Sequence, residues 1–125
     1  MSNKNKIDHR DMVFTLCKSG RAIADEMTPH NAHLVHMVLG ISGEAGELLD
    51  AVKKSVIYNK PLDIENIIEE LGDIEFYLEG LRQELCLTRE QIIQGNIDKL
   101  SVRYDGLKYT DSAAQTRADK NVTKK

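Results

Sequence analysis

Apolar residues in the middle of the chain recur at alternating steps of three and four residues, a spacing that places them on one face of a helix. The first series comprises Leu34, Val38, Ile41, Ala45, Leu48 and Val52. The second comprises Ile64, Ile67, Leu71, Ile74, Leu78, Leu81 and Leu85. Each series is a heptad seam, so the pattern predicts two long helices at about residues 32–57 and 63–86.

A weaker apolar stripe predicts a helix before this pair, at about residues 7–26. Its apolar positions are Val13, Leu16, Cys17 and Ala24. The segment between it and the first long helix, Thr28-Pro29-His30-Asn31, has the composition of a turn. We expect Asn31 to cap the first long helix and Asp63 to cap the second.

A fourth helix is predicted after the second seam. Thr88 and Gln91 have the Thr-x-x-Gln spacing of a capping box, which opens a helix. We expect this helix to run to about Tyr104 and to stop at Gly106. Residues 109–125 are polar and without periodicity, which is typical of a flexible tail.

Together these elements predict an all-α fold, a four-helix bundle-like protomer in residues 1–108 followed by the tail. The short connection between the two long helices favours an antiparallel hairpin. Long seams on two helices of a small chain would leave apolar surface exposed, so we expect the protomer to self-associate.

Composition narrows the class of protein. The 125 residues suit a single domain, and 17 Lys+Arg against 20 Asp+Glu give a net charge of -3. This balance excludes a broad basic surface for nucleic acid. No apolar run approaches the ~18 residues of a membrane span, and residues 1–10 are polar. We therefore expect a cytoplasmic protein that binds neither a membrane nor nucleic acid.

The two cysteines do not form a disulfide framework. Cys17 and Cys86 lie far apart in sequence, each within an apolar helical setting. Two cysteines of this kind are typical of reduced, buried thiols.

Two acidic pairs carry the candidate chemistry. Glu44 and Glu47 stand three residues apart on the first long helix, and Glu70 and Asp73 stand three apart on the second. A spacing of three places both members of a pair on one helix face, where like charges repel unless a cation lies between them. Glycines at 40, 43 and 46 suggest a close helix approach or a kink at the same place.

Both pairs have the same phase relative to their seams. Glu44 and Glu70 each precede a seam residue by one position, and so do Glu47 and Asp73. In an antiparallel hairpin this shared phase gathers all four carboxylates on one flank. Oxygen-only ligands suit Mg²⁺, with Mn²⁺ as a possible substitute, rather than zinc.

The motifs resemble those of the MazG-like nucleotide pyrophosphohydrolases, the all-α NTP pyrophosphatase superfamily. Gly43-Glu44-Ala45-Gly46-Glu47-Leu48 and Glu69-Glu70-Leu71-Gly72-Asp73 are similar to the Glu-x-x-Glu and Glu-x-x-Asp motifs of that family. Residues 96–104 resemble its downstream Asn-x-x-Lys-Leu-x-x-Arg-Tyr segment. The resemblance covers about residues 34–104.

This resemblance implies a helical domain that assembles as a homodimer or homotetramer. It implies that Glu44, Glu47, Glu70 and Asp73 bind Mg²⁺ and carry catalysis. The implied reaction is hydrolysis of a nucleoside triphosphate, NTP or dNTP, between its α and β phosphates, which yields a nucleoside monophosphate and pyrophosphate.

Several cationic and polar residues are candidates for substrate binding. Asn96, Lys99 and Arg103 share one helix face by their spacing, and Lys99 and Arg103 could hold phosphates there. Tyr104 completes the family-like segment. Lys54 follows the first acidic pair by about two turns and could reach a phosphate; a surface charge is the alternative interpretation.

Other functions remain open from the sequence. A dUTP/dCTP diphosphatase or an enzyme of the phosphoribosyl-ATP pyrophosphatase type would use the same acidic cluster with a different base pocket. A non-enzymatic dimerisation or adaptor module would use the two seams and leave the acidic flank solvated.

Overall fold

The computed structural model describes residues 6–121, and this part of the chain is helical without strands. The described residues fall into two compact units, which divide after Ala32. The α-helices are α1 (His9–Leu16), α2 (Gly20–Glu26), α3 (Pro29–Tyr58), α4 (Ile64–Glu84), α5 (Arg89–Arg103) and α6 (Asp111–Thr116). Two short 3₁₀ helices, η1 (Asp105–Leu107) and η2 (Ala118–Asn121), flank α6. The all-α class is confirmed.

The first unit contains two short helices where one was predicted. The expected helix at residues 7–26 is wrong because the chain breaks after α1 and restarts at Ser19. The Ser19 side chain accepts a hydrogen bond from the Ala22 amide at 3.1 Å, which caps α2. Asp8 caps α1 in the same way, at 2.8 Å from the Arg10 amide.

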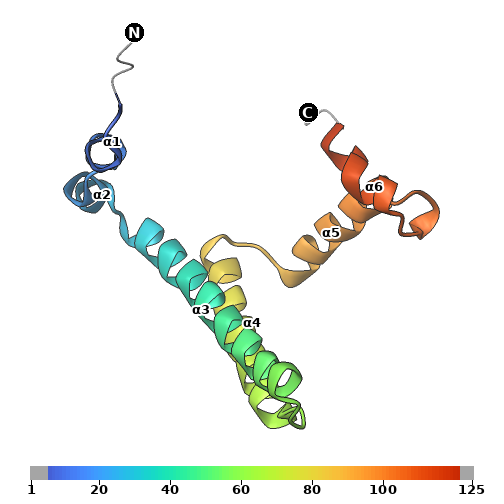
Figure 1. Ribbon diagram of the computed structural model, residues 1–125. Helices are drawn as coiled ribbons and strands as arrows, with labels where there is room; N and C mark the ends of the chain where they lie inside the picture. Colours follow the sequence, from blue (N-terminus) through green and yellow to red (C-terminus); the bar gives the residue numbers. More distant parts are fainter. Residues whose placement is uncertain (1–5, 122–125) are drawn as a thin grey trace. The chain divides into compact units, whose positions relative to one another are not determined.

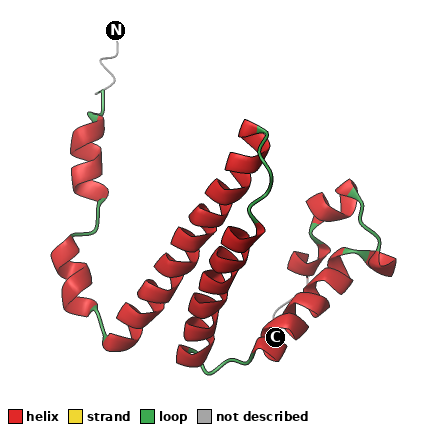
Figure 2. Cartoon of the chain, turned by 90° about the horizontal axis from the view of Figure 1, so that it is seen from below, coloured by secondary structure: helices red, strands yellow, loops and turns green. Residues whose placement is uncertain are grey.

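The second unit is built on a hairpin of α3 and α4, which lie side by side and run in opposite directions (Figures 1 and 2). The predicted Asp63 cap is confirmed, with its carboxylate 3.1 Å from the Asn66 amide. The predicted Asn31 cap is wrong, because Thr28 accepts the hydrogen bond from the Asn31 amide at 3.1 Å and Pro29 is the first helical residue.

Close contacts fix the register of the hairpin. A Cβ added at Gly40 would collide with the Tyr77 ring, and one added at Gly80 would collide with the Met37 side chain. A step of three residues back along α3, from Gly40 to Met37, therefore corresponds to a step of three residues forward along α4, from Tyr77 to Gly80. Glycine at these two positions allows the large side chain of the other helix to lie against the backbone.

This register shows that the contact line lies one residue before the predicted seams. Met37 and Ala51 are the buried apolar residues of the described chain, and they belong to this line together with Gly40 and Gly80. Some seam residues are half exposed, with Val38 at 52% and Leu71 at 47%. Others are partly buried: Leu34, Ile41, Leu48, Ile67, Ile74, Leu78 and Leu81. The seams therefore contribute to the packing together with this neighbouring line, where Gly40 and Gly80 permit a close approach of the helices.

Large apolar side chains therefore remain exposed along the second unit. On α3 and α4 they include Val35, Val38, Leu39, Leu49, Val52, Ile68, Leu71 and Phe76. Single exposed apolar residues are common on folded proteins, whereas here a long series of them lies along both helices. No helix among residues 6–121 combines the length and apolar character that a bilayer span requires.

The chain after α4 forms a second small assembly. The predicted capping box is confirmed, with the Gln91 amide bound to Thr88 at 3.1 Å and the Gln91 side chain bound to the Thr88 amide at 2.8 Å. The helix α5 ends at Arg103, and Gly106 adopts φ 66° at the turn that follows. Then α6 and η2 contact α5.

Residues 109–121 are thus more ordered than their lack of periodicity indicates, since Thr110 caps α6 at 3.0 Å from the Ala113 amide. Residues 122–125 of the predicted tail lie outside the described residues. The division of the chain at residue 108 stays a prediction. The two thiols are reduced, but their predicted burial is wrong, because Cys17 and Cys86 are both exposed.

Candidate metal centre and phosphate-binding residues

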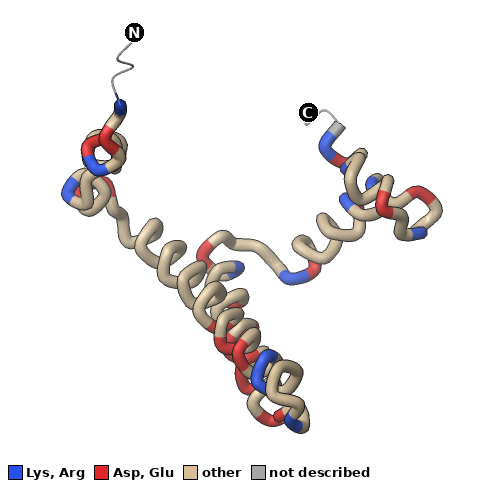
Figure 3. The backbone as a smooth tube through the Cα atoms, in the orientation of Figure 1, with Lys and Arg blue, Asp and Glu red and all other residues tan. Residues whose placement is uncertain are grey.

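The hairpin brings acidic residues of both helices together. With Gly40 opposite Tyr77, the register places Glu44 opposite Asp73, one turn further along α3. Carboxylate oxygens of Glu44, Glu70 and Asp73 all lie within 4.8 Å of one another. Figure 3 shows the acidic residues gathered along these facing stretches of α3 and α4. We call these three residues the acidic cluster.

The surroundings of Glu70 within the acidic cluster disfavour its ionised form. Burial raises the pKa of Glu70, and a hydrogen bond to Glu44 raises it further. The negative charges of Glu44, Glu47 and Asp73 act in the same direction on this pKa. Like charges held this close are typical of a site that accepts a cation or a proton.

Glu47, the fourth predicted carboxylate, lies outside the cluster but near it. Its charge contributes to the raised pKa of Glu70 on one side and to the raised pKa of Lys54 on the other. Three of the four predicted carboxylates are therefore close enough together to bind one metal ion, and the fourth lies beside them.

Lys54 extends the same flank toward the hairpin turn. Its ammonium group lies 2.8 Å from the Asp50 carboxylate, one turn earlier on α3. The hydrogen bond and the charge of Asp50 raise the pKa of Lys54, while the same hydrogen bond lowers the pKa of Asp50. Both side chains are solvent-exposed, so the pair leaves Lys54 accessible to another anion.

The predicted phosphate-binding residues of α5 differ in their partners. Asn96 and Lys99 are exposed, and neither side chain makes a hydrogen bond or ion pair with any residue between 6 and 121. Arg103 instead forms two hydrogen bonds with Asp119 of η2, at 2.9 and 3.4 Å. The Tyr104 ring lies 5.6 Å from that of Tyr109.

Two further contacts differ in how far the sequence pattern indicated them. Asp119 lies in a segment without periodicity, so its pairing with Arg103 could not be anticipated. Tyr77 lies one turn beyond Asp73 and contacts His36 through an edge-on ring contact of 6.1 Å. The glycine at position 40 was the available signal for that close approach.

The comparisons with known proteins agree with this geometry. Residues 33–107 match the model of the MazG nucleotide pyrophosphohydrolase domain. The chain belongs to this family. The matched residues contain most of α3 and all of α4 and α5, and hence both acidic pairs and the Asn96–Tyr104 segment of the MazG domain.

A relative of this MazG protein is found in a bacteriophage. The Gene 37 protein of Mycobacterium phage L5 is 33% identical over 78 residues, which cover 58% of this chain and 67% of the phage protein. No solved structure matches the chain. Family membership indicates pyrophosphohydrolase-type activity that depends on a divalent metal.

Proposed function

We propose that this MazG protein hydrolyses nucleoside triphosphates, NTP or dNTP, to nucleoside monophosphate and pyrophosphate in a Mg²⁺-dependent reaction. The observation that carries the proposal is the acidic cluster, in which two helices of a MazG domain bring three carboxylates within 4.8 Å. Oxygen ligands in this number suit Mg²⁺, and Mn²⁺ could substitute for it.

The residues fit such an ion on chemical grounds. Glu44, Glu70 and Asp73 would hold it, with Glu47 as a further carboxylate beside them. A cation would relieve the mutual repulsion that raises the pKa of Glu70. When bound, the ion would supply charge neutralisation for the triphosphate, which an acidic surface would otherwise repel.

The cationic side chains would then orient the phosphate chain. Lys54 lies on the same flank as the acidic cluster and shares its charge with Asp50. Lys99 and Asn96 are exposed on α5 and can donate hydrogen bonds to a phosphate. Arg103 could bind a phosphate only after its hydrogen bonds with Asp119 break, so we expect Lys99 to contribute more to phosphate binding.

Self-association belongs to the same proposal. Gly40 and Gly80 lie at the contact between the helices, while apolar side chains of both helices, among them Val38, Val52 and Leu71 of the seams, remain exposed. A second copy would cover the seams and remove that apolar surface from water. We therefore propose a homodimer or homotetramer as the active form.

The proposal is tested by pyrophosphate release from a panel of NTPs and dNTPs with Mg²⁺ or Mn²⁺. We expect the wild type to be active and Glu70→Gln to be inactive. Glu69→Gln is the matched control, because Glu69 is an exposed neighbour on α4 outside the cluster. Preference for dUTP or dCTP, or for phosphoribosyl-ATP, would identify the corresponding diphosphatase. Absence of release from every nucleotide would favour the adaptor module instead.

A further inference from the structure

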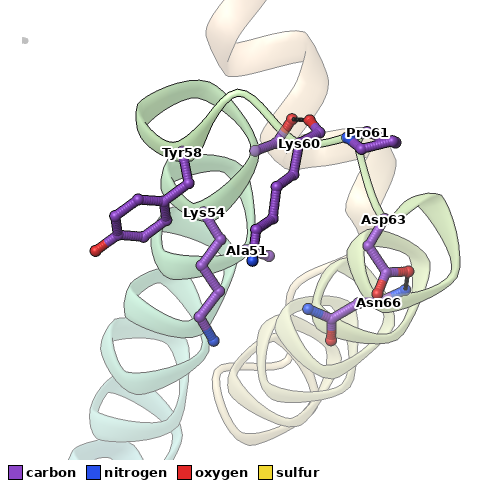
Figure 4. A pocket seen from close by; sticks show the side chains of 8 residues that line it. Ala51, Lys54, Tyr58, Lys60, Pro61, Asp63 and Asn66 are labelled. Atoms are coloured by element: carbon purple, nitrogen blue, oxygen red, sulfur yellow. Dashed lines mark hydrogen bonds between the residues drawn. The ribbon is translucent and has the colours of Figure 1, made fainter.

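A pocket of about 420 Å³ lies at the turn of the hairpin, between the end of α3 and the start of α4 (Figure 4). Lys54, Ser55 and Tyr58 of α3 line one side, and Asn66 of α4 lines the other. Lys60 reaches in from the connection. In Figure 4 its side chain folds back along α3 and ends beside Ala51.

The backbone of the turn fixes the position of Lys60. Its amide donates a hydrogen bond to the Ser55 carbonyl at 3.0 Å, and the Ser55 hydroxyl donates one to the Lys60 carbonyl at 2.7 Å. Asn59 adopts φ 51°, the left-handed conformation that ends α3. The two hydrogen bonds therefore fix the backbone of Lys60 at the edge of the pocket, although its side chain is exposed.

The pocket offers hydrogen-bond donors that have no partner of their own. Within residues 6–121, neither the Lys60 ammonium nor the Asn66 side-chain amide makes a hydrogen bond or ion pair. Asp63 is the acidic residue of the lining, and its carboxylate caps α4 through the Asn66 amide nitrogen of the backbone. The Lys60 ammonium and the Asn66 amide, with the Lys54 ammonium that Asp50 already binds, favour an anionic ligand with several acceptor oxygens.

The pocket lies on the same flank as the acidic cluster. Lys54 follows Glu47 by seven residues, and Asn66 precedes Asp73 by seven, so each pair shares a helix face. By the register of the hairpin, Ala51 and Asn66 are opposite each other, one turn beyond Glu47 and Glu70. Four residues correspond to about 6 Å along the helix, and the seven residues to Glu44 and Asp73 correspond to about 10 Å. The Lys54 side chain points back toward Asp50, which shortens the distance between its ammonium group and the acidic residues.

Resting on the function proposed above, we infer that this pocket binds the β and γ phosphoryl groups of the nucleotide. The α phosphate would lie at the acidic cluster, and the rest of the phosphate chain would extend along α3 toward Lys60. The pocket would then make the enzyme sensitive to the number of phosphates. Lys60 and Asn66 are the new substrate-binding residues.

Calorimetric titration with inorganic pyrophosphate in the presence of Mg²⁺ tests the pocket without requiring turnover. We expect Lys60→Gln to bind pyrophosphate about tenfold more weakly than the wild type, and Lys60→Arg to bind it normally. Lys53→Gln is the matched control, because it removes the same charge from α3 outside the pocket, and its affinity should stay within about twofold. Circular dichroism confirms that each variant is helical.

The outcomes separate this pocket from the proposed function. Equal binding by Lys60→Gln and Lys53→Gln would overturn the pocket even if the enzyme hydrolyses nucleotides. Lys60-dependent binding in a protein that hydrolyses no nucleotide would retain the pocket as a pyrophosphate site and reject the proposed reaction. In an active enzyme, Lys60→Gln should also lower the preference for triphosphate over diphosphate by about tenfold.

Discussion

The acidic cluster of the hairpin and the Arg103–Asp119 pair are both groups of partly shielded charges, but they are balanced in opposite ways. In the pair, opposite charges meet in two hydrogen bonds, and the side chains are only 16% and 7% exposed. In the cluster, carboxylates meet carboxylates, and the pKa of Glu70 rises. The opposite charges of the pair satisfy each other, whereas the cluster holds like charges together, and the proposed metal site rests on this arrangement.

This difference separates structural charges from functional ones. An ion pair whose hydrogen bonds are satisfied holds elements together, here η2 against α5. Like charges held together by the fold cost stability, and they are typical of a site that binds a cation. Substitutions in the two groups should therefore have opposite consequences for activity and for local stability.

The largest effect is expected for Asp73→Asn. This change removes a charge from the cluster, so we predict that pyrophosphate release falls by about 100-fold or more. The helical content should not fall, because the substitution also reduces repulsion. Turnover and circular dichroism measured in parallel test this expectation. Loss of helicity would mean that Asp73 has a structural role.

The next effect concerns Asp119→Asn, which leaves the shielded Arg103 guanidinium without its countercharge. We predict that hydrogen exchange of the amides in residues 111–121 accelerates about tenfold. Exchange in α3 and α4 should not change. Mass spectrometry of peptides from the two regions gives both rates. Unchanged exchange in α6 and η2 would show that other contacts hold this segment.

A smaller effect is expected from metal addition. Binding to the folded state alone stabilises it, so Mg²⁺ at ten times its dissociation constant should raise the Tm by about 5 °C. Glu70→Gln should not show this increase, while Glu69→Gln should retain it. Differential scanning fluorimetry with and without chelator measures the three proteins. An equal rise in all of them would place the metal elsewhere.

The smallest effect is a local dependence on pH. The hydrogen bond from Arg103 holds the pKa of Asp119 below its usual value near 3.8. A lowered pKa stabilises the folded form above the pKa of the unfolded chain, and this contribution is lost as the pH falls through the folded pKa. Contacts of η2 with α5 should therefore persist at pH 5 and weaken below about pH 4. NMR shifts of α6 and η2 report this transition, and a transition near neutral pH would contradict it.

Sequence periodicity was sufficient for the main elements of the second unit. The helices α3, α4 and α5 follow from apolar spacing and from the caps at Asp63 and Thr88, because these signals are local. The acidic cluster could also be anticipated, since the phase of Glu44 and Asp73 needs only the direction of the hairpin.

Packing could not be predicted in the same way. The seams predicted contact through residues such as Val38 and Leu71, yet these two are exposed. On the neighbouring face, Tyr77 and Met37 pack against Gly40 and Gly80. Which face of one helix packs closest to the other depends on the shapes of both helices. The apolar pattern of either helix alone does not contain this information. The Arg103–Asp119 pair joins residues 16 apart through a segment without periodicity.

The most direct test of the difference between the two charged groups is a Mn²⁺ titration followed by electron paramagnetic resonance. Wild type, Glu69→Gln and Asp119→Asn should bind Mn²⁺ with the same affinity, and Glu70→Gln should bind it at least about tenfold more weakly. If Glu70→Gln binds Mn²⁺ as tightly as the wild type, or if the wild type binds none, the acidic cluster is not a metal centre.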